Sequence, residues 1–150
     1  MEKPQIYVSL KHEDLKYMHQ ILEWDKDNAF EFSFTDKAIR PAFHSNEGAA
    51  LKDELKAKIK SGTHLLCLVG KNTANNDWIN WEIQTASVTG KKVLAVRLDK
   101  KNKAPAAALN FGAAWADTFT FEAIAKVIEL GLGGPEEIVG GAVMGGMMEK

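Results

Sequence analysis

Short apolar runs alternate along the chain with stretches in which apolar residues recur every three or four positions. Residues 6–10 predict the first strand. The run at residues 64–69 is too short and too apolar for anything but a strand buried on both faces, as in the middle of a parallel sheet, and residues 93–98 predict another buried strand. Residues 30–34 instead alternate strictly between Phe and polar side chains. This alternation predicts an outer strand with one buried face and one more solvent-exposed face.

The stretches between these runs predict amphipathic helices. The side chains expected to face inward are Leu15, Met18 and Leu22; Leu51, Leu55 and Ile59; Ile79, Ile83 and Ala86; and Ile124, Val127 and Ile128. The first helix is expected to run to about Asn28. The later helices are expected to be N-capped by Ser45 or Asn46, by Asn76 or Asp77, and by Thr120, and to end at Gly62, Gly90 and Gly131.

The remaining segments predict loops and a tail. Residues 35–46 form a long loop, and the lysine-rich residues 99–105 are expected to need only solvent. Residues 106–120 carry no clear pattern, although Trp115 is expected near a short final strand. Residues 133–150 are rich in Gly and Met, which disfavours a stable helix. The sequence therefore predicts a domain at residues 1–132 and a tail at 133–150, for which flexibility is favoured over a role in association.

The regular alternation of strand and helix predicts an α/β fold with a parallel sheet covered on both sides. The simplest arrangement is a flavodoxin-like three-layer sandwich with strand order 2-1-3-4-5. In that order the chain reverses between the first and third strands, so the loops after Leu10 and Val69 line one crevice. The polar segment at residues 9–12 is then expected to face residues 70–82.

Composition excludes several classes of partner. The chain has 150 residues, 45% of them hydrophobic and 26% charged, and a formal net charge of −1. This charge gives no broad attraction to nucleic acid or to acidic membranes. No apolar run has the length that a bilayer requires, and residues 1–20 carry charges where a signal peptide would need an apolar core. We therefore expect neither nucleic acid nor a membrane as a partner.

Candidate metal ligands and nucleophiles are weak in this sequence. The single cysteine, Cys67, lies in an apolar strand, can form no internal disulfide and suits a reducing cytoplasm, which is the expected location. His12, Glu13, Asp14 and His19 are of metal-ligand types, but a solvated turn and helix face would place them where they are, so no metal is expected. No Gly-x-Gly-x-x-Gly motif follows the first strand, which argues against a Rossmann dehydrogenase.

The most informative segment is the helix that follows the third strand. Trp78 and Glu82 are separated by four positions and lie on the flank of the helix, away from the inward-facing stripe that Ile79 begins. Neither is expected to be required by the core, and both are expected to face the crevice. A carboxylate beside an indole can form a nucleotide site, because the ring stacks on a flat ligand and the carboxylate opposes positive charge. The alternative is a solvated glutamate next to a boundary tryptophan.

These residues carry a resemblance to a known family. Residues 7–9 on the first strand, Asp14 in the turn after it, and Trp78 and Glu82 together resemble a TIR-type domain. The similarity is closest to the short TIR-like proteins of bacterial Thoeris antiphage defence and covers about residues 5–130. Many members carry an aromatic residue after the serine of the first strand, whereas this chain has Leu10.

The resemblance implies cleavage of NAD at the bond between nicotinamide and ribose, often with cyclisation to a signal nucleotide that activates a separate effector protein. NAD is then a substrate, and no cofactor is implied. Self-association or a phage-derived trigger is a further expectation. The expected catalytic residue is Glu82, and the expected substrate-binding residues are Ser9, Leu10, Lys11, Asn76 and Trp78.

Two hypotheses follow from the residues and the resemblance. In the first, the chain is an NAD-consuming enzyme in which the carboxylate of Glu82 stabilises an oxocarbenium-like ribose. In the second, it is a TIR-like module that binds protein or nucleotide without turnover. Fold alone cannot separate these two hypotheses.

Overall fold

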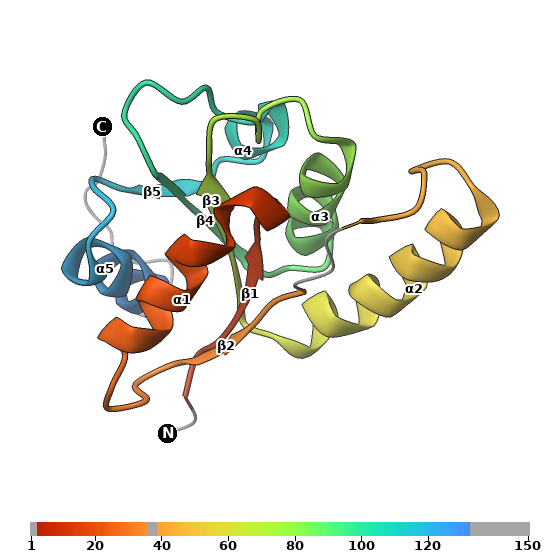
Figure 1. The fold of residues 1–150 in the computed structure, drawn as a ribbon. Helices are drawn as coiled ribbons and strands as arrows, with labels where there is room; N and C mark the ends of the chain where they lie inside the picture. Colours follow the sequence, from red (N-terminus) through yellow and green to blue (C-terminus); the bar gives the residue numbers. More distant parts are fainter. Residues whose placement is uncertain (1–2, 36–38, 133–150) are drawn as a thin grey trace.

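The computed structural model describes residues 3–35 and 39–132, which form a parallel sheet with helices on both faces (Figure 1). The strands are β1 (Gln5–Ser9), β2 (Glu31–Ser33), β3 (His64–Val69), β4 (Lys92–Arg97) and β5 (Ala114–Ala116). They pair in the order β2-β1-β3-β4-β5, and every pairing is parallel. The predicted flavodoxin-like topology is confirmed.

Helices cover the two faces of the sheet unequally. They are η1 (His12–Asp14), α1 (Leu15–Trp24), α2 (Asn46–Ser61), α3 (Asp77–Val88), α4 (Ala106–Asn110) and α5 (Phe121–Leu132). Helices α1 and α5 pack on one face, whereas α2, α3 and α4 pack on the other (Figure 1). None of the helices within residues 3–35 and 39–132 is long and apolar enough to cross a membrane.

The core consists of two layers separated by the sheet. Because side chains alternate along a strand, β1 sends Ile6 and Val8 toward α1 and α5, and Tyr7 toward α2 and α3. Strand β3 is buried at every position, as its continuous apolar run predicts for a central strand. Strand β2 exposes Glu31 and Ser33 and lies at an edge of the sheet, which confirms the prediction of an outer strand.

The predicted helix caps are mostly confirmed. Ser45 Oγ accepts a hydrogen bond from the backbone N–H of Gly48 at 2.9 Å, at the start of α2. Thr120 Oγ1 accepts one from Ala123 at 3.2 Å, at the start of α5. The expected stop at Gly131 is wrong, because α5 continues to Leu132.

The predicted end of the first helix is also wrong. Helix α1 ends at Trp24 rather than near Asn28, because Asp25 forms a competing turn. Its carboxylate accepts hydrogen bonds from the backbone N–H groups of Ala29 at 2.8 Å and Phe30 at 3.3 Å, and Asn28 adopts a φ of 53°. An aspartate that bonds nearby backbone groups in this way favours a turn over further helix.

Residues 99–120 are more ordered than the sequence indicates. The loop after β4 does not need only solvent, because Asn102 Nδ2 donates to the carbonyl oxygen of Val69 at 2.8 Å. Helix α4 was not predicted, whereas the short final strand at Trp115 is confirmed as β5. The proposed tail at residues 133–150 lies outside the described residues.

Candidate active site

Helix α3 brings Glu82 against the central strand β1. The helix begins just past the carboxyl end of β3, where Asn76 Oδ1 accepts a hydrogen bond from the backbone N–H of Ile79 at 2.9 Å. Glu82 lies in the second turn, and its side chain has no exposed surface. The predicted alternative of a solvated glutamate is therefore wrong. A buried carboxylate requires polar partners, because its desolvation is otherwise too costly.

Three side chains supply those partners. Tyr7 and Ser9 lie two positions apart on β1, so both point toward α3. Tyr7 Oη donates to Glu82 Oε2 at 3.1 Å, and Ser9 Oγ donates to Glu82 Oε1. Arg40 Nη1 lies 2.7 Å from Oε2 and forms an ion pair with it. The carboxylate is thus held in one orientation by neutral donors below it and a cation beside it.

The hydroxyl of Tyr7 acts as a permanent donor in this network. Burial, followed by the negative charge of Glu82, raises the pKa of Tyr7 well above its ordinary value of 10.0. Both effects disfavour the phenolate. The hydroxyl therefore keeps its proton at neutral pH and orients the glutamate without taking part in proton transfer.

Arg40 comes from the loop between β2 and α2 and reaches Glu82 from the side of the crevice. Its side chain is 14% exposed, whereas Glu82 is fully covered. Its guanidinium carbon also lies 5.4 Å from the centre of the Trp78 ring, a cation–π distance. Arg40 therefore touches both members of the predicted Trp and Glu pair.

The expectation that the core does not require Trp78 is wrong. Trp78 is 7% exposed and belongs to the hydrophobic core on the α2 and α3 side. Its ring meets Phe43 edge to face at 5.2 Å, and its Nε1 donates to the carbonyl oxygen of Pro41 at 3.2 Å. The position of Trp78 on the helix does not reveal this contact, because the covering residues belong to a distant loop.

A crevice of about 680 Å³ lies beside this pair, within the size range of small-molecule sites. Three segments line it, namely the end of β1 with the turn after it, the loop before α2, and the start of α3. The lining includes Leu10, Lys11, Asn76 and Trp78 among the predicted binding residues. The structure therefore brings these four residues together around one crevice.

Ser9 and Glu82 are absent from the lining of the crevice. Both are fully buried, and Arg40, which does line the crevice, bonds directly to Glu82. Arg40 therefore separates the carboxylate from the open space. Access of a ligand to Glu82 requires displacement of the Arg40 side chain.

Sequence reasoning missed Tyr7 and Arg40 as site residues. Tyr7 was recoverable, because the period of two along β1 places it on the same face as Ser9. Arg40 carried no local signal, since it lies in an irregular loop and is 42 positions from its partner.

Other chemistries receive no support from the described residues. Within residues 3–35 and 39–132, no three His, Cys, Asp or Glu side chains gather closely enough to hold a metal ion. Cys67 is completely buried, and burial together with the charges of Glu82 and Asp14 raises the pKa of its thiol. Because the thiolate is the reactive form, Cys67 is not a candidate nucleophile.

Comparison with known families gives a match over most of the domain. Residues 7–103 match the family model described as Thoeris protein ThsB, TIR-like domain. The matched range contains Tyr7, Ser9, Arg40, Trp78 and Glu82. None of the curated proteins matches the sequence.

Solved structures share the fold at low sequence identity. A 2-deoxyribosyltransferase from the psychrotolerant bacterium Bacillus psychrosaccharolyticus is 17% identical with a TM-score of 0.57, covering 77% of this chain and 87% of its own. The CMP N-glycosidase BcmB from Clostridium botulinum is 13% identical with a TM-score of 0.55, covering 84% and 99%. A pilus assembly-related protein from Burkholderia pseudomallei is also 13% identical with a TM-score of 0.55, covering 87% and 90%. At these identities the likeness concerns the fold alone.

Proposed function

The chain belongs to the TIR-like domain family of the Thoeris protein ThsB, and on that premise we propose that it cleaves NAD at the bond between nicotinamide and ribose. Its role would be to produce an ADP-ribose-derived signal nucleotide, cyclic in our proposal, during antiphage defence. The product would activate a separate effector protein.

The observation that carries this proposal is the buried, fixed carboxylate of Glu82, which lies directly behind Arg40, a residue that lines the crevice of about 680 Å³. Tyr7 and Ser9 hold it from below, so its position does not depend on the ligand. A preorganised charge of this kind stabilises a developing positive charge more effectively than a solvated one, because it needs no reorganisation.

The chemistry suits a single carboxylate. Breaking the bond to nicotinamide leaves positive charge on the ribose ring, which Glu82 would stabilise while accepting a hydrogen bond from a ribose hydroxyl. Nicotinamide departs as a neutral pyridine from a cationic precursor, so the reaction needs no strong general acid. Trp78 and Leu10 would contribute apolar walls, and Lys11 would contribute a positive charge near the phosphates.

The fate of the ribose cation determines the product. Attack by water gives ADP-ribose, whereas attack by a nucleophile on the same molecule gives a cyclic isomer. Holding both reacting groups inside one crevice favours the intramolecular route. We therefore propose a cyclic product as the signal.

Arg40 has to leave Glu82 before the ribose can approach the carboxylate, because the two groups are in contact at 2.7 Å. We propose that this contact belongs to a resting state, and that self-association or a phage-derived trigger releases it. The freed guanidinium would remain available to the phosphates of NAD.

The structural neighbours are compatible with this chemistry. Two of them are named as a 2-deoxyribosyltransferase and a CMP N-glycosidase. Both names denote enzymes that act on glycosidic bonds. At 17% and 13% identity they supply no site residues for this chain.

One observation favours a second candidate, a TIR-like module that binds protein or nucleotide without turnover. Glu82 has no exposed surface and both of its carboxylate oxygens already have partners. If Arg40 never leaves, the carboxylate is a structural part of the domain and the crevice serves for binding only.

The deciding experiment incubates the purified protein with NAD and follows nicotinamide and the nucleotide product by chromatography. The protein is assayed across a range of concentrations and with lysate from phage-infected cells, so that activation by assembly or by a trigger is covered. Time-dependent nicotinamide release supports the enzyme. Saturable NAD binding without release under all these conditions supports the binding module.

A further inference from the structure

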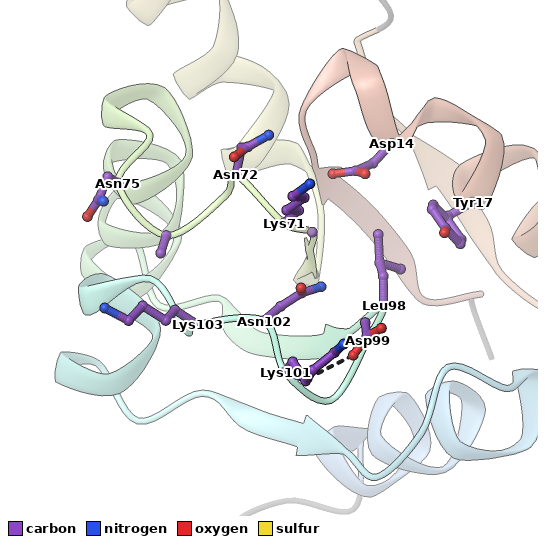
Figure 2. Close-up of a pocket in the computed structure, with 12 residues that line it drawn as sticks. Asp14, Tyr17, Lys71, Asn72, Asn75, Leu98, Asp99, Lys101, Asn102 and Lys103 are labelled. Atoms are coloured by element: carbon purple, nitrogen blue, oxygen red, sulfur yellow. Dashed lines mark hydrogen bonds between the residues drawn. The ribbon is translucent and has the colours of Figure 1, made fainter.

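A second cavity of about 750 Å³ lies at the same edge of the sheet as the crevice. Figure 2 shows the residues that line it. Its walls come from the turn after β1 and from the loops after β3 and β4. It includes neither Glu82 nor Arg40 nor Trp78, and it shares only Asn75 with the lining of the crevice. The carboxyl edge of a parallel sheet is where open α/β folds bind their ligands.

Three lysines give this cavity a positive rim. Lys71 comes from the loop after β3, and Lys101 and Lys103 come from the loop after β4. Their ammonium groups form no ion pair within the described residues. Asp99, also at the rim, accepts a hydrogen bond from the backbone N–H of Lys101 through Oδ1 at 2.9 Å, and its carboxylate keeps its negative charge. Such a group of cations is suited to binding phosphate oxygens.

The loops that carry these lysines are fixed by internal hydrogen bonds. Asn102 donates to the carbonyl oxygen of Val69 at 2.8 Å, and its own carbonyl oxygen accepts from Arg97 Nε at 3.0 Å. Thr73 Oγ1 accepts from the backbone N–H of Gly70 at 2.8 Å. The cavity is therefore already shaped without a ligand, which lowers the ordering cost of binding.

Asp14 supplies an unused acceptor on the opposite wall. It is 7% exposed, and its Oδ2 has no hydrogen-bond partner among the described residues. Its carboxylate points across the cavity toward the side on which Lys71 lies (Figure 2). It also packs so closely on Gly70 that a methyl group at position 70 would overlap it. A buried oxygen without a partner is costly, and a ligand hydroxyl would satisfy it once the Asp14 carboxylate turned from Gly70 toward the cavity.

We propose that this cavity binds a nucleoside phosphate, with the phosphate on Lys71, Lys101 and Lys103 and a sugar hydroxyl on Asp14. An inorganic phosphate would fill little of the volume and would leave Asp14 without a hydroxyl donor. A nucleoside without phosphate would leave the lysines unused. The half-buried ring of Tyr17 and the side chain of Leu98 provide apolar surface for the rest of the ligand. This site does not depend on turnover of NAD in the crevice.

The test titrates the isotopically labelled full chain with ADP, adenosine and inorganic phosphate, and follows backbone amides by NMR. We expect ADP to shift the amides of residues 70–75 and 98–103 saturably, and to bind at least tenfold more tightly than adenosine or phosphate. Shifts confined to residues 40–43 and 76–79 would assign ADP to the crevice and overturn the proposal. Equal binding of phosphate and ADP would also overturn it, since the site would then recognise only an anion.

Charge reversal provides the matched comparison. The double variant Lys101→Glu/Lys103→Glu should lower the ADP affinity at least tenfold. The control Lys56→Glu/Lys60→Glu makes the same change in charge on the exposed face of α2 and should alter the affinity less than twofold. Equal losses in the two double variants would show a nonspecific charge effect and would contradict the assigned site. The amide spectrum of each variant verifies its fold.

Discussion

Arg40 Nη1 lies 2.7 Å from Glu82 Oε2 and joins the loop before α2 to the inner face of α3. The pair has two consequences that oppose each other. It compensates a fully buried negative charge, which stabilises the fold, and it keeps that charge away from the crevice. The same contact therefore stabilises the domain and, in the proposed mechanism, controls access of the ribose to Glu82.

We expect Arg40→Ala to lower the free energy of unfolding by about 3 kcal/mol, the lower end of the range for breaking a buried ion pair from one side. The cost arises because Glu82 stays buried without its cation, although Tyr7 and Ser9 still donate to it. Urea denaturation measures the change. Arg40→Lys keeps a charge and should cost less.

A double-mutant cycle provides the control for this prediction. Adding Glu82→Gln to Arg40→Ala should recover part of the lost stability, because the remaining partner is then neutral. Strictly additive losses would mean that the two side chains do not interact in solution.

Trp78→Ala should cost about 3–5 kcal/mol, as expected for a buried tryptophan. The residue is 7% exposed and packs edge to face against Phe43 at 5.2 Å. Trp81→Ala is the matched control, because Trp81 lies on the same helix but is only half-buried. Thermal unfolding compares the two variants. A smaller loss for Trp78→Ala than for Trp81→Ala would contradict its place in the core.

The strand order and the crevice were predictable because both follow from local patterns. The continuous apolar run of β3 identified a central strand, and parallel topology then placed the loop after β1 opposite the start of α3. Hydrophobic burial determines those features, and hydrophobicity is visible in the sequence.

The burial of Trp78 and Glu82 was not predictable in the same way. A helical wheel assigns faces from one helix alone, whereas here residues 40–43 fold over the flank of α3. Asp25 and Asn102 were missed for a related reason, since each acts through hydrogen bonds to backbone groups that hydrophobic periodicity does not describe.

Asp14 is expected to make stability depend on acid pH. Burial, then the neighbouring charge of Glu13, raises the pKa of Asp14 above its ordinary value of 3.8, against smaller opposite effects of Lys11 and Lys16. The folded state therefore binds this proton more tightly than the unfolded state. The resulting stabilisation is complete below pH 3.8 and is lost as the pH rises through the pKa of the folded state.

Asp14→Asn removes this titration, so the variant should gain stability relative to the wild type as the pH rises above 3.8. Urea midpoints measured between about pH 4 and 7 test the trend. The exposed Asp53→Asn is the control and should follow the wild type. Parallel curves for all three proteins would show that Asp14 does not titrate differently in the folded state.

Glu82→Gln is expected to keep the fold and to end nicotinamide release. Gln has nearly the shape and helix propensity of Glu, and its carbonyl oxygen can still accept from Ser9 or Tyr7. What it lacks is the negative charge. If that charge stabilises the ribose cation, its loss should slow turnover by about a hundredfold or more, as for other preorganised electrostatic partners.

The measurement compares nicotinamide released from NAD by the wild type, Glu82→Gln and Glu129→Gln under conditions in which the wild type is active. Glu129 is exposed on α5, so its substitution removes the same charge at a distance from the crevice. Circular dichroism verifies equal folding, and NAD titration separates a loss of binding from a loss of chemistry. Equal rates in the wild type and Glu82→Gln would exclude Glu82 as the catalytic residue. The buried carboxylate would then be a structural centre, and its network with Tyr7, Ser9 and Arg40 would serve to fasten α3 to the sheet.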